Sequence, residues 1–195
     1  MKIKQPKQIR SFLVEAFGKN RGGDALFGAQ DKMLGALIAN TKNKSVGQMK
    51  TLTRTILPRI ALYKAMLGDG IPEADVYAYM QKYMPEKVAV KKHKSAAGME
   101  IVPGFYALYS KIFLRIMRKT DLQESTQSHD KKSFDATITK CLWHTACVEN
   151  GCAELCRLFC AVEDVTYGGL RKIGFTRTQT LGNGDDCCDF HFFRK

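Results

Sequence analysis

The stretch Phe175–Phe193, FTRTQTLGNGDDCCDFHFF, decides the fold expected for the second part of this chain. Residues 175–181 are rich in threonine, which predicts a strand. The pair Asn183-Gly184 is a strong hairpin signal, because both central positions of a tight antiparallel turn must accept a positive φ. Residues 187–193 are then the returning strand. The stretch therefore predicts an antiparallel hairpin.

Two further elements are predicted before this hairpin. Residues 134–143 partly alternate between apolar and polar and contain many β-formers, which indicates a strand. Residues 149–162 have the pattern of a helix. The polar residues 121–132 predict a linker. The second part of the chain thus has an expected β-α-β-hairpin order.

The first part of the chain is predicted to be helical. Residues 24–39 carry an apolar stripe at nearly helical spacing. Ser45-Val46-Gly47-Gln48 is a plausible capping box. The helix that it begins contains Pro58, which removes a backbone hydrogen bond and should kink or break the helix. Pro72 and Pro103 stand where new helices begin.

These elements predict an α+β fold, with a helical N-terminal part followed by a small antiparallel sheet. A chain of 195 residues most often forms one domain. We therefore expect a single domain over residues 1–195. Within it we expect a basic helical part (1–120), a linker (121–132) and a cysteine-rich α+β part (133–195).

Charge is distributed unevenly along the chain. Residues 1–132 hold 24 basic and 11 acidic side chains, whereas residues 133–195 hold 7 and 8. A basic region can attract nucleic acid, anionic lipid or a small anion. Its densest cluster, Lys87–Lys94, is expected in an exposed loop, and no nucleic-acid-binding signature accompanies it. We expect a small anionic substrate, neither nucleic acid nor membrane as a partner, and leave a homo-oligomer open.

The cysteines and the N-terminal residues predict a cytoplasmic protein. No apolar run approaches the roughly 20 residues that span a bilayer. The basic start, Met1–Lys7, does not lead into a signal peptide, because Arg10, Glu15 and Lys19 interrupt the apolar residues after it. All seven cysteines lie in residues 133–195. Their odd number and the missing export signal favour reduced thiols.

One helix face gathers candidate functional groups at intervals of four residues: Cys152, Cys156, Cys160 and Asp164. Residues four apart are neighbours on a helix surface, so Cys160 and Asp164 should be adjacent. A buried carboxylate needs a partner, and Arg177 on the facing strand is the nearest candidate. A purely structural Arg–Asp pair is the alternative.

Strand alternation separates the hairpin residues into two faces. Cys188 shares one face with two phenylalanines and is favoured to point into the core or a pocket. Asp189 shares the other face with His191, where it can instead anchor the turn.

A zinc site is the alternative to a site without metal. Cys141, Cys160 and Cys188, with His144 or a carboxylate, have suitable ligand atoms. However, the sequence contains no C-x2-C or H-x3-H pair. It also contains no phosphate-binding glycine loop and no nucleophile elbow. We therefore predict no metal and no cofactor.

Over its last third, the sequence resembles the L-2-amino-thiazoline-4-carboxylic acid hydrolase family. The residues that carry the resemblance are Cys141 after a strand, Gly151, Glu154-Leu155, Cys160-x3-Asp164, and Arg177-x2-Thr180-Leu181-x2-Gly184-x3-Cys188-Asp189-Phe190. The pattern is also distantly similar to four-vinyl-reductase-type ligand-binding domains. Some of those bind zinc through a Glu and a Cys before the turn, which Thr176–Leu181 does not supply.

The resemblance implies a hydrolase that opens a cyclic amidine at a C–S or C–N bond, giving N-carbamoylcysteine from the named substrate. A non-catalytic ligand-binding or sensor module is the alternative. For hydrolysis, Asp164 can hold the amidine or activate water, and Cys160 or Cys188 can attack covalently. Arg177 can bind the substrate carboxylate. The other candidates for contact with substrate are Cys141, Asp189 and His144.

Overall fold

The structure is a computed structural model that describes residues 7–195, apart from the side chains of residues 20 and 21. The chain divides into two compact units, with the boundary between Tyr83 and Met84. The single domain expected from chain length stays a prediction. Residues 1–6 of the basic start lie outside the described residues. No helix of the described residues is long and apolar enough to cross a membrane.

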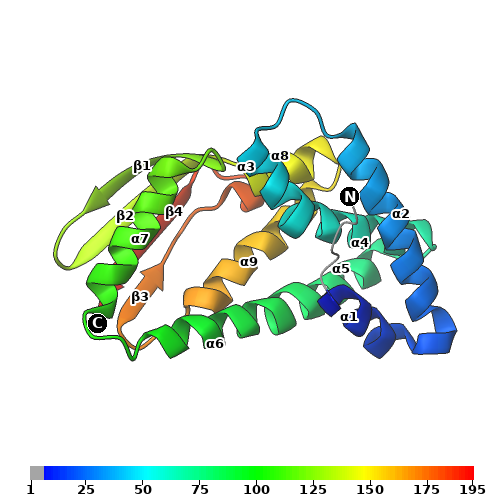
Figure 1. Cartoon of the computed structure of the whole chain (residues 1–195), viewed down its shortest axis with the longest axis horizontal. Helices are drawn as coiled ribbons and strands as arrows, with labels where there is room; N and C mark the ends of the chain where they lie inside the picture. Colours follow the sequence, from blue (N-terminus) through cyan, green and yellow to red (C-terminus); the bar gives the residue numbers. More distant parts are fainter. Residues whose placement is uncertain (1–6) are drawn as a thin grey trace. The chain divides into compact units, whose positions relative to one another are not determined.

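The first unit is built from helices (Figure 1). They are α1 (Lys7–Phe17), α2 (Asp24–Asn40), α3 (Val46–Thr51), α4 (Leu57–Gly68) and α5 (Glu73–Gln81). A helical turn, η1 (Lys19–Gly23), bends at Gly22, where φ is 134°. Fully buried side chains from α1, α2, α4 and α5 form its core, among them Leu13, Leu34, Ile60 and Met80.

The expected capping box is present, and the kink or break expected at Pro58 takes the form of a π-helical turn just before it. The Ser45 side chain accepts the Gln48 N–H, and the Gln48 side chain accepts the Ser45 N–H. After α3 the chain widens into a π-helical turn, η2 (Leu52–Ile56), before α4 begins. Pro58 then lies in the first turn of α4, where its missing N–H costs no hydrogen bond.

The exposed loop predicted for Lys87–Lys94 is wrong. These residues belong to η3 (Lys82–Ala89), a π-helical segment that crosses the unit boundary, and to α6 (Val90–Met99). Lysine is a good helix former, so a lysine cluster does not oppose a helix. Ala89 and Ala96 are buried, and α6 packs against α9 (Cys156–Tyr167) within the second unit. This packing favours the helix.

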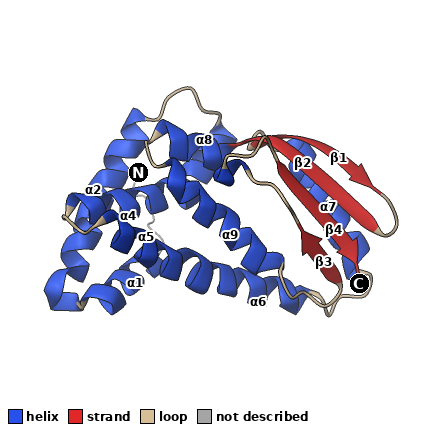
Figure 2. Cartoon of the chain, turned by 180° about the vertical axis from the view of Figure 1, so that it is seen from behind, coloured by secondary structure: helices blue, strands red, loops and turns tan. Residues whose placement is uncertain are grey.

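The second unit combines helices with a sheet (Figure 2). After α6 come α7 (Phe105–Lys119), β1 (Gln123–His129), β2 (Ser133–Cys141), α8 (Leu142–Glu149), η4 (Ala153–Leu155), α9, β3 (Ile173–Thr176), η5 (Leu181–Asn183) and β4 (Cys188–Arg194). Within the described residues the strands form one antiparallel sheet in the order β1-β2-β4-β3. The α+β prediction is confirmed.

Aromatic side chains fill the core between the sheet and its helices. Phe134 on β2 is paired with Phe192 on β4, and their rings stack at 4.7 Å. Tyr109 of α7 and Tyr167 of α9 both pack against Phe192. Each such ring contributes roughly 1.5–3 kcal/mol of burial free energy. The two helices are therefore held on one face of the sheet.

The alternation predicted for the last strand is confirmed. Cys188, Phe190 and Phe192 are buried, whereas Asp189 and His191 on the other face are partly exposed. This register brings the Cys188 sulfur to the covered face of the sheet, beside α9.

The linker predicted for residues 121–132 is wrong, because Gln123–His129 is the edge strand β1. An edge strand can be polar on both faces, so its composition is similar to that of a loop. Asp130 closes the turn to β2 by accepting the N–H groups of Lys132 and Ser133. Ser128 also donates to Asp135 across the pair, at 2.7 Å.

Several predicted boundaries also differ from the structure. The strand expected for residues 175–181 is Ile173–Thr176, because the chain leaves the sheet after Thr176. The strand expected for residues 134–143 ends at Cys141, where α8 begins. The helix expected for 149–162 begins at Cys156 and ends at Tyr167, because the chain turns at Gly151 with a φ of 62°.

The two-residue turn predicted at Asn183-Gly184 is wrong. Strands β3 and β4 pair, but residues 177–187 connect them, with Asn183 in the short helix η5. Gly184 has a φ of 94°, whereas Asn183 does not have a positive φ. The long connection, defined here as the 177–187 loop, covers part of α9.

Candidate functional site

Sulfur atoms from α9 and β4 meet beneath the 177–187 loop. Cys156 and Cys160 lie one turn apart on α9, and Cys188 begins β4. The loop touches both sulfurs, since a Cβ atom on Gly182 would lie 2.9 Å from Cys160 Sγ and the Leu181 N–H donates to Cys188 Sγ. The groups that act on the Cys160 thiol include the thiols of Cys156 and Cys188 and the Thr180 hydroxyl. The structure thus brings Cys160 and Cys188 together, whereas their catalytic roles stay predictions.

This arrangement makes Cys160 the thiolate of the group. Hydrogen bonds from the thiols of Cys156 and Cys188 hold the pKa of Cys160 well below its ordinary value, and the Arg177 cation adds to the effect against the opposing influence of burial. The same bond to Cys160 raises the pKa of Cys188. Of the two thiols, Cys160 is therefore the more acidic.

The 177–187 loop approaches the Cys160 sulfur so closely that only glycine fits at residue 182. A Cβ atom on Gly182 would lie 2.9 Å from that sulfur and 3.2 Å from the backbone nitrogen of Arg157. The neighbouring N–H of Leu181 donates to the Cys188 sulfur at 3.3 Å. The sequence pattern around Asn183-Gly184 did not reveal this role of Gly182.

Arg177 is a buried cation whose contacts connect the loop to α9. Its side chain is 7% exposed, and Nη2 donates to Asp164 Oδ2 at 2.5 Å and to the Cys160 carbonyl at 2.8 Å. Nη1 reaches Glu163 Oε2 at 3.4 Å. The expected Arg177–Asp164 pair is present. Its three contacts within the protein correspond to the structural alternative for this pair.

The aromatic rings beneath Arg177 fix the plane of its guanidinium. Phe175 and Phe190 lie 5.9 and 5.7 Å from its central carbon, within the range of cation–π attraction. The guanidinium is thus held from below by the sheet and from the side by α9.

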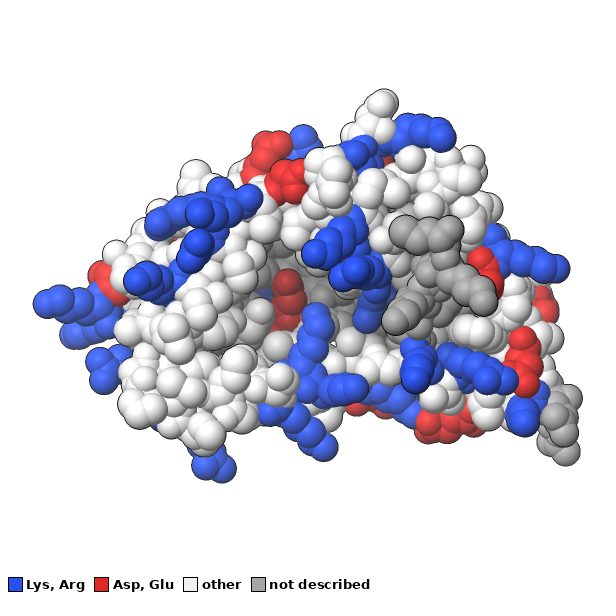
Figure 3. Space-filling view, in the orientation of Figure 1, with Lys and Arg blue, Asp and Glu red and all other residues white. Residues whose placement is uncertain are grey.

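Glu163 is the functional candidate that the sequence analysis missed. Burial raises its pKa to about 8, the Cys160 charge adds to this, and Arg177 and Lys92 oppose it. Yet 40% of its side-chain surface is exposed. Solvent therefore reaches this carboxyl although protein atoms surround it. Figure 3 shows acidic atoms set back between basic side chains on one face of the molecule.

The Glu163 charge also acts on two tyrosines, Tyr167 and Tyr109. Burial, together with the Glu163 charge, raises the pKa of Tyr167 to about 12. The ring of Tyr167 packs edge-on against that of Tyr109, with 6.3 Å between the ring centroids. The spacing Cys160-x2-Glu163 was the available signal, since residues three apart share a helix face.

Asp189 does not join the thiols. It accepts the N–H of Thr178 at 2.9 Å, the Thr178 hydroxyl at 2.6 Å and the N–H of Gln179 at 2.6 Å. Although partial burial opposes the shift, these hydrogen bonds lower the pKa of Asp189. Asp189 therefore anchors the start of the 177–187 loop, which is the alternative that strand alternation had left open.

Cys141 lies near Cys160, and the backbone of His144 acts on Cys141. Burial raises the pKa of Cys141 to about 11, and the backbone groups of His144 and Trp143 at the start of α8 oppose this shift. The charges of Glu163 and Cys160 raise the pKa of Cys141 further. Across residues 7–195, no group of three or more His, Cys, Asp or Glu side chains is arranged to hold a metal ion.

Fold and site together define an α+β protein with a thiolate–carboxyl site on one helix. The family model of L-2-amino-thiazoline-4-carboxylic acid hydrolase matches residues 48–192. The chain therefore belongs to this family. The matched residues begin in the helical first unit. The match therefore covers much more of the chain than the C-terminal third on which the resemblance was based.

Other comparisons add less. No curated protein sequence matches the chain. Two solved structures of an H-NOX protein from S. oneidensis, one in the Fe(II)NO ligation state and one a mutant in the Fe(II) state, are 14% identical to it. Both alignments cover 97% of this chain, and 99% and 96% of those chains. Their TM-score of 0.33 is too low to assign a fold or a ligand.

Proposed function

We propose that this protein is a small-molecule hydrolase that opens the ring of L-2-amino-thiazoline-4-carboxylate, or of a closely related cyclic amidine, to give N-carbamoylcysteine. One observation carries the proposal beyond family membership. The Cys160 thiolate lies one turn from Glu163, whose pKa of about 8 allows it to give and take protons near neutral pH.

In the first half of the reaction, the Cys160 thiolate attacks the ring carbon between sulfur and nitrogen. The bond from that carbon to the ring sulfur breaks, and protonated Glu163 gives its proton to the leaving sulfur. The products of this half are an isothiourea linking Cys160 to the substrate carbon, a free substrate thiol and an ionised Glu163. Thiols leave readily, because their pKa is near 8.5.

In the second half, ionised Glu163 takes a proton from water as the water oxygen attacks the same carbon. The bond to the Cys160 sulfur then breaks and the thiolate is restored. A low pKa makes Cys160 a good leaving group as well as an ionised nucleophile. A proton shift from oxygen to nitrogen gives the carbamoyl group, and Glu163 is protonated again.

The other groups support these two residues. Cys188 donates a hydrogen bond to the Cys160 sulfur and is not the nucleophile, because its own pKa is raised. Asp164 and Arg177 act as positioning residues, since their ion pair fixes the loop against α9. Lys92 on α6 acts electrostatically on Glu163. Lys92 is therefore the candidate to bind the substrate carboxylate, because the guanidinium of Arg177 is already engaged by α9.

The test is thiol release from L-2-amino-thiazoline-4-carboxylate, measured with a thiol reagent after the protein is removed. We expect Cys160→Ala to abolish turnover and Glu163→Gln to lower it by about 10²–10⁴-fold, the range for loss of a general acid or base. Cys187→Ala is the matched control, because Cys187 bonds to Gln179 and does not belong to the thiol group. Full activity in Cys160→Ala would exclude covalent catalysis by this residue.

A second experiment, mass spectrometry of the protein, distinguishes catalysis from ligand binding. After acid quench, mass spectrometry of the wild-type protein with substrate should show an adduct on Cys160 equal in mass to the intact substrate. Saturable binding of the substrate with neither adduct nor thiol release would instead support the ligand-binding module.

A further inference from the structure

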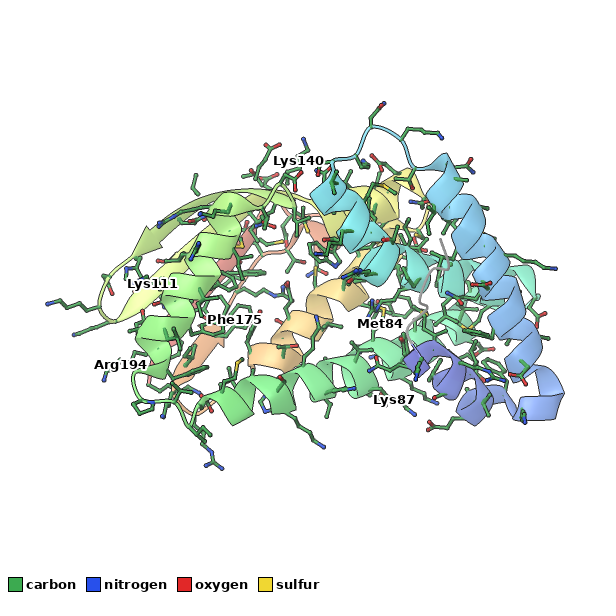
Figure 4. All side chains as sticks on the ribbon, in the orientation of Figure 1. Met84, Lys87, Lys111, Lys140, Phe175 and Arg194 are labelled. Atoms are coloured by element: carbon green, nitrogen blue, oxygen red, sulfur yellow. The ribbon has the colours of Figure 1, made fainter. Side chains whose placement is uncertain are left out.

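A groove of about 1000 Å³ runs along α7 within the second unit. Its lining residues come from one face of α7, the β1–β2 turn and the ends of the strands, and none of them belongs to the thiol site. They are Gly104, Phe105, Tyr106, Ala107, Ser110, Lys111, Leu114, Arg115, Arg118, His129, Asp130, Lys131, Lys172, Arg194 and Lys195. Figure 4 labels Lys111 on α7 and Arg194 at the end of β4. We call this feature the α7 groove.

The α7 groove is strongly basic. Seven of its lining residues are Lys or Arg, and Asp130 is the only acidic one among the residues that line it. Asp130 is already engaged by the N–H groups of Lys132 and Ser133. Within residues 7–195, no ion pair joins Lys111, Arg115 or Arg194 to a carboxylate. The groove thus concentrates positive charge that the described protein does not neutralise.

The first turn of α7 adds backbone donors at one end of the groove. Gly104 precedes the helix with a φ of 68° and provides no side-chain cap. The N–H of Leu108 is bonded to the Gly104 carbonyl, whereas the N–H groups before it have no acceptor within the helix. Such donors, together with the helix dipole, favour an anion.

Tyr106 supplies an independent sign of a missing ligand. It lines the groove and is 8% exposed, and its hydroxyl oxygen has no hydrogen-bond partner in the described part of the chain. Burial raises the pKa of Tyr106, Asp130 and Asp135 add to this, and Arg194 opposes it. Two of these charged residues, Asp130 and Arg194, also line the groove. A buried polar group left unpaired is costly, and a ligand acceptor would satisfy it.

We propose that the α7 groove binds a compact small molecule carrying two or more phosphate groups. Lys111, Arg115 and Arg118 follow one another along α7 at steps of roughly 6 and 4.5 Å, from a rise of 1.5 Å per residue. Cations at this spacing can hold separate phosphate groups, and Arg can do so bidentately. This site is separate from the proposed reaction, so the two proposals fail independently.

The test is calorimetric titration of the full chain with inorganic pyrophosphate at constant ionic strength. We expect saturable binding at one site per chain. Lys111→Gln and Arg115→Gln should each weaken it about tenfold, from the loss of one charge-assisted hydrogen bond. Lys94→Gln is the matched control, because Lys94 is an exposed lysine of α6 outside the groove.

Tyr106→Phe separates a ligand contact from a structural role. It should weaken pyrophosphate binding severalfold, while the unliganded variant unfolds at the same temperature as the wild type or higher. Cys160→Ala should still bind pyrophosphate. Absence of saturation, equal loss in Lys94→Gln, or steeply salt-dependent binding of duplex DNA without pyrophosphate binding would each overturn the proposal.

Discussion

Gly182→Ala should damage the site and the stability of the fold together. The added methyl carbon would lie 2.9 Å from the Cys160 sulfur and 3.2 Å from the backbone nitrogen of Arg157. Favourable contacts between non-bonded heavy atoms lie near 3.5–4.0 Å, so the overlap is about 0.5–1 Å. A rotation of the Cys160 side chain cannot relieve it fully, because a backbone atom is also in the way. Overpacking of this kind costs about 1–3 kcal/mol.

The same displacement should change the reactivity of Cys160. If the loop moves outward, the Thr180 hydroxyl withdraws from the sulfur and one stabilising contact of the thiolate is lost. We therefore expect the pH midpoint of Cys160 alkylation by iodoacetamide to rise in Gly182→Ala. Urea denaturation measures the stability change, and mass spectrometry assigns the alkylated residue.

Gly98→Ala is the matched control for this substitution. Gly98 lies in α6, and a methyl group added to it would meet open space, since no atom would be within 4 Å. Alanine there should stabilise the protein by roughly 0.5–1 kcal/mol through helix propensity. Unchanged stability and an unchanged alkylation midpoint in Gly182→Ala would refute the close-approach argument.

Three further changes test other parts of the structure. Thiol release by the wild type should fall as pH rises through about 8, because Glu163 loses the proton that it gives to the leaving sulfur; a profile flat from pH 6 to 10 would contradict this. Asp189→Ala should cost about 1–3 kcal/mol in urea denaturation at pH 7. Because hydrogen bonds depress the pKa of Asp189, its contribution is present above the unfolded value and is lost as pH falls through the native one. The deficit of Asp189→Ala should therefore shrink toward pH 3, and a deficit independent of pH would count against the anchor. Glu100→Gln should cost about 1–3 kcal/mol, since buried Glu100 accepts two backbone N–H groups before β3 at 3.0 and 2.6 Å; a change below about 0.5 kcal/mol would show that these bonds contribute little.

Local patterns predicted the elements whose causes are local. The capping box at Ser45 and the break at Pro58 follow from hydrogen bonds within a few residues. The alternation of Cys188, Phe190 and Phe192 gave the correct buried face of β4, because one face of that strand is covered. In contrast, strand β1 has no apolar face to reveal it, and its pairing with β2 is visible only in the assembled sheet.

The candidate site was predictable in part for the same reason. Helical spacing alone placed Cys160 beside Asp164, and one short stretch of sequence supplied Arg177. Glu163 was missed because its importance lies in its raised pKa, which depends on the atoms that surround it. Gly182 was missed because its role depends on how closely the loop approaches α9.

The sequence by itself determined a helical first part, a small antiparallel sheet and the family to which the chain belongs. It also determined which residues share a helix or strand face, because those periodicities follow from backbone geometry. Only the tertiary structure decided which thiol and which carboxyl have shifted pKa values and where the basic side chains meet in a groove. Those properties depend on desolvation and on charges brought together from distant segments, and neither quantity is defined until the chain is folded.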